Sequence, residues 1–354
     1  MRLLSIMLVS LASQAMPALA EQSSSTDCQN PALAKRELHL VFENDVFAEK
    51  LGLSKSDRWY TNGVKAIAKI NHDEPPWWYS KSWEKLTQKD ANQACMEFGI
   101  TFGQMMYTPM DIKQSAPQIN DRFWGGWLYV GTLLQSRPRL RDAAARGDLE
   151  TFELDVGVVG PLSLAQQSQK TVHALIGAPT PAGWHNQLKS ELAIQTTYSR
   201  AFTFKQAHNN LLGFDLAAHY GFGLGTLFNY ANAGATIRIG NNLSGAPVGT
   251  IENPSLMAFE QPANRAYVLA RVDAKASLHN TFIDGSLLRQ APHASNVRSK
   301  HLVLQATVGL VIESKSLAVH RFAFLFNRRS AEFNTPPGAA SLQNFGTMLL
   351  EVDF

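Results

Sequence analysis

The sequence predicts an all-β protein: a transmembrane antiparallel β-barrel of about twelve strands, with a short helix in an extracellular loop at the barrel mouth. Three observations predict this class. The chain begins with a secretion signal, segments of roughly ten residues with alternating hydrophobicity recur to its end, and the last segment closes on an aromatic residue, Phe354. Alternating segments separated by turn residues in an exported chain are typical of bacterial outer-membrane barrels. A secreted soluble β-protein is the alternative.

Residues 1–20 have the composition of a signal peptide. Arg2 supplies a positive charge, an apolar run follows, and Ala18-Leu19-Ala20 is a small-residue cleavage site. We therefore expect a signal peptide over 1–20 and one barrel domain over 21–354. The apolar run is too short to cross a membrane, and no later run of about 18 apolar residues predicts a transmembrane helix.

The charge and the cysteines constrain the partners and the compartment. The formal net charge of the full chain is +3, which is close to neutral, and nothing in the composition indicates nucleic acid as a partner. The two cysteines, Cys28 and Cys95, permit a disulfide in an exported protein without requiring one. In the predicted topology both lie on the periplasmic side, and whether they pair stays open.

The predicted strands follow from alternation with a period of two. In the first strand Leu38, Leu40 and Phe42 fall on one face, and mostly polar residues fall on the other. Twelve such segments give an even number of strands, as expected for a single-chain bacterial barrel. They cover residues 37–47, 58–70, 96–107, 122–136, 149–160, 190–204, 209–224, 227–240, 265–279, 300–313, 317–328 and 344–354.

The end of the first strand carries a candidate metal site. Glu43, Asn44 and Asp45 place two carboxylates and an amide close together. Oxygen ligands of this kind suit a hard cation such as calcium. The alternative is an ordinary solvated strand end.

Between the fifth and sixth strands the sequence predicts a helix over residues 164–176. Ser163 with Gln166 three residues later has the spacing of a capping box, and Gly177 suits the position after the helix. Gln169 and His173 are four residues apart and share a face of this helix. A histidine at a barrel mouth is a candidate general base, because its pKa lies near the working pH. The alternative is a surface histidine without a role.

A linked series of six motifs follows in order along the chain: Phe42–Phe47, Asp57–Gly63, Gly103–Pro109, Gln169–His173, Gly183–Leu188 and Phe282–Gly285. Together these motifs resemble the lipid A deacylases of the LpxR type over nearly the whole mature chain. One departure is visible, because Arg122-Phe123-Trp124-Gly125-Gly126-Trp127 stands where the family usually reads Arg-Pro-Tyr-Ala-Gly-Trp.

The resemblance implies a twelve-stranded barrel in the bacterial outer membrane with a calcium-dependent esterase at its outer mouth. Such an enzyme removes the 3′-O-linked acyloxyacyl group from lipid A, so its partners are lipopolysaccharide and the lipids of the outer membrane. By the match, Asp45 corresponds to the calcium-binding aspartate and His173 to the essential histidine. Asn44, Thr61 and Gln169 occupy matching positions around the site.

The residues themselves are consistent with ester hydrolysis. His173 can take a proton from water, and a calcium ion held by Asp45 can polarise the carbonyl. The sequence has no G-x-S-x-G elbow for a serine nucleophile and no H-E-x-x-H motif for zinc. Two alternatives remain: a non-catalytic porin or adhesin barrel, and a barrel phospholipase that acts on glycerophospholipids.

Overall fold

The computed structural model describes residues 37–47, 59–70, 94–138, 148–208, 212–243, 264–334 and 342–353. The predicted signal peptide and Cys28 lie outside these residues, as does the side chain of Cys95. Among the helices in the described ranges, none is long and apolar enough to cross a membrane.

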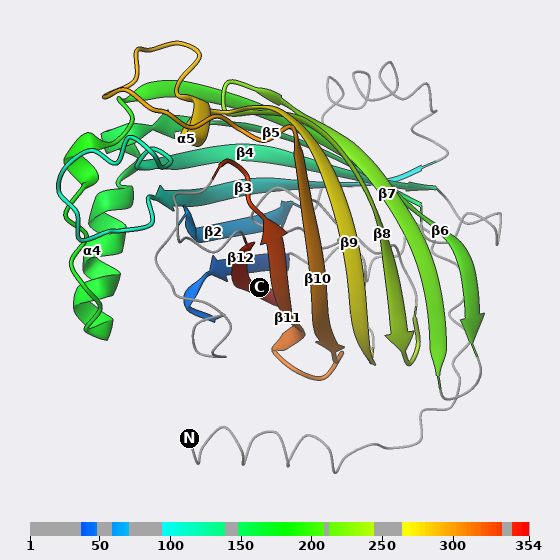
Figure 1. Cartoon of the computed structure of the whole chain (residues 1–354). Helices are drawn as coiled ribbons and strands as arrows, with labels where there is room; N and C mark the ends of the chain where they lie inside the picture. Colours follow the sequence, from blue (N-terminus) through cyan, green and yellow to red (C-terminus); the bar gives the residue numbers. More distant parts are fainter. Residues whose placement is uncertain are drawn as a thin grey trace.

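Twelve antiparallel strands close into a barrel, as predicted (Figure 1). Each strand pairs with its neighbours in the sequence, and β1 closes the barrel by pairing with β12. The boundaries fall within a few residues of the predicted ones. The strands are β1 (Glu37–Asn44), β2 (Trp59–Ile70), β3 (Ala94–Thr108), β4 (Gly125–Pro138), β5 (Leu149–Val159), β6 (Glu191–His208), β7 (Gly213–Gly225), β8 (Phe228–Gly240), β9 (Arg265–Asn280), β10 (Leu302–Glu313), β11 (Val319–Ser330) and β12 (Leu342–Asp353).

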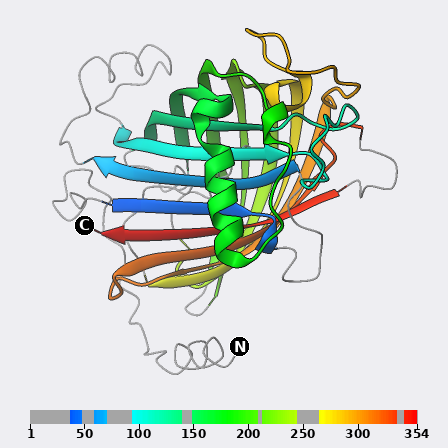
Figure 2. The same ribbon diagram turned by 90° about the vertical axis from the view of Figure 1, so that its left-hand side faces the viewer.

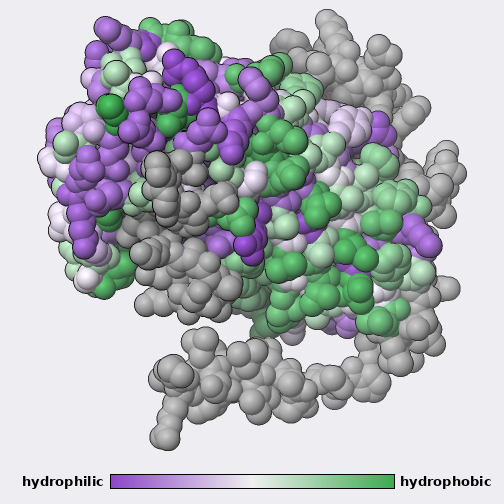
Figure 3. All heavy atoms as spheres, viewed as in Figure 1, coloured by the Kyte–Doolittle hydropathy of each residue, from purple (hydrophilic) through white to green (hydrophobic). Residues whose placement is uncertain are grey.

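The alternating pattern separates a polar interior from an apolar exterior. Ion pairs lie inside the lumen, such as Lys65 Nζ to Glu153 Oε1 at 2.5 Å and, between neighbouring strands, Arg238 Nη2 to Asp215 Oδ2 at 2.6 Å. Hydrophobic surface gathers over the strands, and hydrophilic surface gathers at the end of the molecule that carries α4 (Ala165–Ile176) (Figure 3). An apolar exterior is what lipid chains require of a barrel wall. Exposed apolar residues on this exterior include Ile100, Phe102, Val130, Leu154, Val156, Val268, Val272, Val308 and Leu310.

An aromatic cluster fills the barrel near the end towards which the odd-numbered strands run, which we call the outer mouth. The short helix α5 (Thr281–Asp284) inserts Phe282, which is fully buried and stacks on Tyr107 with ring centroids 4.1 Å apart. Asp284 holds this helix in place, because its carboxylate accepts hydrogen bonds from Asn280 N, Ser299 N and Ser299 Oγ. The other members of the cluster include Tyr60, Met105, Phe123, Trp127, Tyr129, Phe228, Tyr230 and Phe345.

Candidate active site

The helix α4 is one residue shorter than predicted, and its predicted capping box is wrong. Ser163 ends a preceding 3-10 turn, Gly160–Ser163, and its Oγ donates to Gly160 O at 2.6 Å. The N-cap is therefore Leu164, which has a left-handed backbone with φ 58° and no side-chain cap. The predicted end is confirmed: Gly177 has φ 70°, and hydrogen bonds to His173 O close the last turn.

α4 packs against the outer side of the barrel wall, not across the lumen. On β4, the side chains of Trp127 and Tyr129 point inward to the aromatic cluster. Because successive residues of a strand face opposite sides, Gly126 faces the outside of the barrel. A Cβ at Gly126 would lie 2.2 Å from the Ala165 Cβ, which shows how closely the helix approaches this wall. Figure 2 shows α4 in front of β1–β4, running across the direction of the strands.

One buried stripe of α4 carries both of the predicted helical site residues. Ala165, Gln169 and His173 are four residues apart and are the buried residues of the helix. Gln169 is 3% exposed, and its Oε1 accepts a hydrogen bond of 2.7 Å from Trp184 Nε1. Its Nε2 has no hydrogen-bond partner among the described residues. The side-chain amide is thus fixed at one end and holds a buried donor at the other.

The imidazole of His173 is oriented by a backbone carbonyl. Nδ1 lies 2.6 Å from Pro179 O, in the segment directly after the helix. Because a carbonyl oxygen can only accept, Nδ1 must carry the hydrogen in this contact. In the neutral ring, Nε2 is then the basic nitrogen. The structure therefore presents the tautomer that a general base needs.

The ends of β1 and β2 carry the remaining predicted residues. Asn44 Oδ1 accepts from Val46 N at 2.8 Å, which turns the chain just after β1, and Asp45 follows with 2% exposure. A bulge between Tyr60 and Asn62 interrupts the pairing of β2 with β3, and Thr61 Oγ1 lies 2.8 Å from Thr108 Oγ1.

Glu43 departs from the predicted metal cluster. It points into the lumen, where Oε2 accepts from the Tyr60 hydroxyl at 2.8 Å and Oε1 accepts from Thr347 Oγ1 at 2.9 Å. Alternation explains this, because Glu43 and Asn44 are consecutive residues of a strand and so face opposite sides of the wall. Of the two carboxylates in the predicted cluster, Asp45 is the one that lies beyond the strand end.

The predicted site residues lie on two parts of the molecule, the ends of β1 and β2 and the helix α4. Thr61 contacts β3 at Thr108, and Met106 of the same strand packs with Ala165 of α4. Asn44 pairs in register with Asn62, next to Thr61. The structure thus gathers Asn44, Asp45 and Thr61 at the outer rim of the wall. Gln169 and His173 lie on the helix that covers the neighbouring strands.

Sequence reasoning missed the tryptophans that support this helix. Trp184 binds Gln169, and its ring lies 5.1 Å from the ring of Trp124. Gly183 lies so close to Trp124 that a Cβ there would be 2.6 Å from the indole. Trp184 stands in a motif that carries the family resemblance, whereas Trp124 stands in the segment that departs from the family pattern, so comparison with the family was the available signal for both.

A second buried feature, Arg122, was also missed. Its guanidinium lies over the Tyr107 ring at 4.4 Å, and Nη1 contacts Glu332 at 3.4 Å. Lys275 and Arg329 also face this carboxylate. Burial by itself raises the pKa of Glu332, but the three cations outweigh it and lower this pKa to about 2. Glu332 therefore stays ionised and holds the strands and loops of the outer mouth together.

The comparisons agree with this geometry. The family model described as "Outer membrane protein LpxR" matches residues 3–354. The chain belongs to the LpxR family. Its membership and its barrel place this LpxR-family protein in the outer membrane.

A solved structure shares this fold. LpxR from Salmonella typhimurium matches with a TM-score of 0.69 at 18% identity, over 90% of this chain and 100% of that one. The β domain of the Bordetella autotransporter BrkA gives 0.43 at 7% identity, over 90% and 99% of the two chains. No curated protein matches the LpxR-family chain significantly.

Proposed function

We propose that this LpxR-family barrel is a calcium-dependent esterase of the outer leaflet, which hydrolyses the 3′-O-linked acyloxyacyl chain of lipid A. The observation that carries the proposal is the position of His173. It lies on a helix against the outer side of the wall, and its Nδ1 is bound to Pro179 O. A lipid reaches the outer side of the wall from within the membrane, whereas a solute in a pore would not.

In this proposal His173 acts as the general base. Nε2 takes a proton from a water molecule whose oxygen attacks the ester carbonyl, and the Pro179 carbonyl keeps the ring oriented as the imidazolium forms. As the C–O bond to the sugar breaks, the imidazolium returns this proton to the leaving 3′ oxygen and the acyl group departs as a carboxylic acid. Gln169 is a positioning residue held by Trp184, with its free Nε2 available for the water or the ester. The sequence-based roles of both residues are retained.

The residues at the end of β1 fit calcium by their donor chemistry. The buried Asp45 carboxylate, the Asn44 side-chain oxygen and the Thr61 hydroxyl are hard oxygen donors gathered at one rim. Asp45 would hold the ion directly. When bound, the ion supplies Lewis-acid polarisation of the ester carbonyl.

The filled outer mouth disfavours the porin alternative. Among the described residues, fourteen buried apolar and aromatic side chains form one cluster there, with Phe282 stacked on Tyr107. Such a cluster packs the outer mouth with side chains, while a diffusion pore requires an aqueous channel. The phospholipase alternative shares the ester chemistry and is separated by substrate alone.

Mass spectrometry of lipid A from cells with and without the protein tests the proposal. We expect lipid A that lacks the 3′-acyloxyacyl group when the wild type is present. Asp45→Ala and His173→Ala should each lower the rate of ester hydrolysis by about 10²–10⁴-fold. The double variant should be only slightly slower than either single variant, because the effects of residues that act as a unit are not additive. EGTA should silence the wild type, and added calcium should restore it.

The outcomes separate the alternatives. Unchanged lipid A together with cleaved glycerophospholipid would identify a phospholipase. Activity of a folded His173→Ala barrel that resists EGTA would overturn the mechanism.

A further inference from the structure

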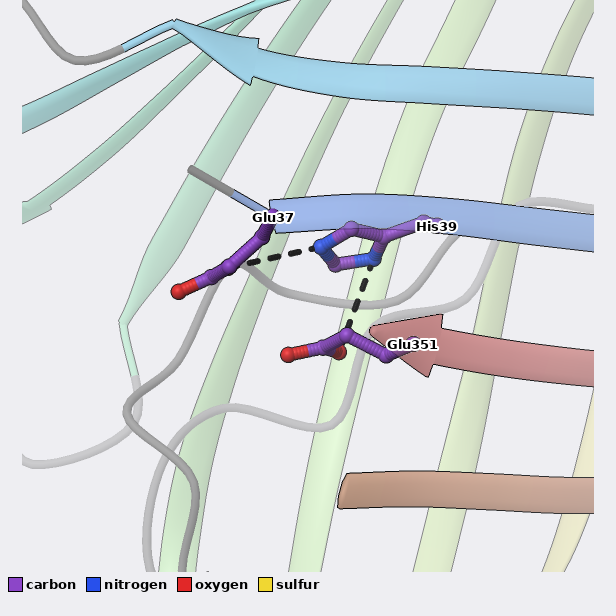
Figure 4. Close-up of side chains that lie close together, drawn as sticks. All are labelled: Glu37, His39 and Glu351. Carbon is purple, nitrogen blue, oxygen red and sulfur yellow. Dashed lines mark ion pairs between the residues drawn. The ribbon is translucent and has the colours of Figure 1, made fainter. Parts of the chain in front are cut away.

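A second group of metal-ligating side chains lies at the other end of the barrel, on the seam where β1 meets β12. Glu37 and His39 come from the start of β1, and Glu351 comes from β12, directly opposite His39 in register. His39 Nε2 lies 3.5 Å from Glu37 Oε2, and Nδ1 lies 3.6 Å from Glu351 Oε2 (Figure 4). One ligand atom from each residue fits within a span of 4.8 Å.

The two carboxylates are buried and only half satisfied. Glu37 is 3% exposed; Lys69 donates to its Oε1, and its Oε2, which faces His39, accepts no hydrogen bond among the described residues. Glu351 is fully buried; Arg321 donates to its Oε2, and its Oε1 accepts no hydrogen bond from the described part of the chain but lies 3.5 Å from His320 Nε2. A buried carboxylate oxygen without a donor is costly, so the Glu37 oxygen beside His39 favours a cation.

The charges around the cluster also favour a cation. The permanent cations of this region already bind carboxylates: Lys69 contacts Glu37 and Glu97, and Arg321 contacts Glu313 and Glu351. Arg137 and Arg265 complete the set. Among the described residues these four permanent cations face five carboxylates, the fifth being Asp353, which lies 3.2 Å from His320.

We propose that Glu37, His39 and Glu351 bind one divalent transition-metal ion of the Zn²⁺ class. An imidazole with two carboxylates suits zinc, whereas calcium prefers oxygen ligands alone. Ligands about 2.0–2.2 Å from a tetrahedral ion lie roughly 3.4 Å apart, and one ligand atom from each of the three residues already fits within 4.8 Å. The two carboxylates lie at different ring nitrogens of His39, Glu37 at Nε2 and Glu351 at Nδ1, so one carboxylate would turn to the nitrogen that binds the ion.

The position of the site suggests what the ion does. β1 and β12 are the first and last strands, and their pairing alone closes the barrel. An ion held by Glu37 and His39 on one side and Glu351 on the other links these strands near both ends of the described chain. Because the ligands meet only in the folded barrel, binding stabilises that state. The site is independent of the proposed calcium site at the outer mouth.

Zinc titration of the purified, folded barrel tests the proposal. The Asp45→Ala/His173→Ala double variant serves as the background, so that the outer site contributes no histidine or aspartate ligand. After EDTA treatment and dialysis, isothermal titration with ZnCl₂ should show one ion per barrel. The temperature at which the barrel loses its fast migration on unboiled gels should rise when zinc is present.

Variants in the same background locate the site. His39→Asn and Glu37→Gln should each weaken zinc binding by at least the roughly 10–100-fold that loss of a supporting partner costs. His219→Asn is the matched control, because His219 is a buried lumen histidine whose Nε2 lies 2.7 Å from Asp273. It should bind zinc as the background does.

Two results would overturn the proposal. One is a background barrel that takes up no zinc, which would leave His39 as an ion-pair partner of the two carboxylates. The other is a zinc affinity in Glu37→Gln equal to that of the background. Because glutamine has nearly the same shape as glutamate, this variant tests the site even if His39→Asn fails to fold.

Discussion

The hydrogen bond from Trp184 to Gln169 offers a sharp test of how the candidate site is held. Trp184→Phe removes the indole N–H and keeps an aromatic ring in place. Gln169 Oε1 then loses its 2.7 Å partner in a setting where Gln169 is 3% exposed. A buried acceptor left unsatisfied costs about 1–3 kcal/mol. If the amide shifts in response, that energy corresponds to a loss of roughly 10–100-fold in the rate of ester hydrolysis.

The neighbouring indole supplies a matched control. Trp124 lies 5.1 Å from Trp184 between ring centroids, and its Nε1 has no hydrogen-bond partner among the described residues. Trp124→Phe therefore removes similar ring area from the same cluster but no hydrogen bond. Acyl release followed by mass spectrometry should fall further in Trp184→Phe than in Trp124→Phe. Equal losses would mean that packing, not the hydrogen bond, sets the position of Gln169.

Three further predictions concern the rest of the molecule. Glu332 has a native pKa of about 2 against an ordinary 4.5, so the unfolded state binds more protons between these values and stability falls as the pH falls through them. Glu332→Gln should therefore be destabilised by on the order of 3 kcal/mol at neutral pH, and denaturant titrations at several pH values should show this difference shrinking towards pH 2. Phe282→Ala, at a fully buried stacked ring, should lower stability by about 3–5 kcal/mol; an unchanged melting temperature would show that the cluster is loosely packed. Gly177→Ala should lower stability by about 1 kcal/mol, because the backbone φ of 70° disfavours a residue with a Cβ even though that Cβ would meet open space. Faster proteolysis at the end of α4 would show this loss.

The sequence by itself determined the barrel, its number of strands and most of their boundaries. The alternation of apolar and polar residues indicates which side of each strand faces lipid. A closed barrel is the arrangement that leaves no strand edge in the membrane. The sequence also located α4 and its glycine end, since Gly177 is the residue that tolerates a positive φ at little cost. These features depend on residues close together in the chain.

Only the tertiary structure decided which side of the wall holds the candidate site. The alternation of Glu43 and Asn44 was visible, but nothing local shows that α4 packs on the outer side at Gly126 or that Glu43 belongs to the lumen. The contacts that fix these positions join residues on different elements, such as Gln169 with Trp184, or Tyr60 of β2 with Glu43 of β1. The seam cluster has the same origin, because Glu351 meets His39 through the closure that pairs the last strand with the first.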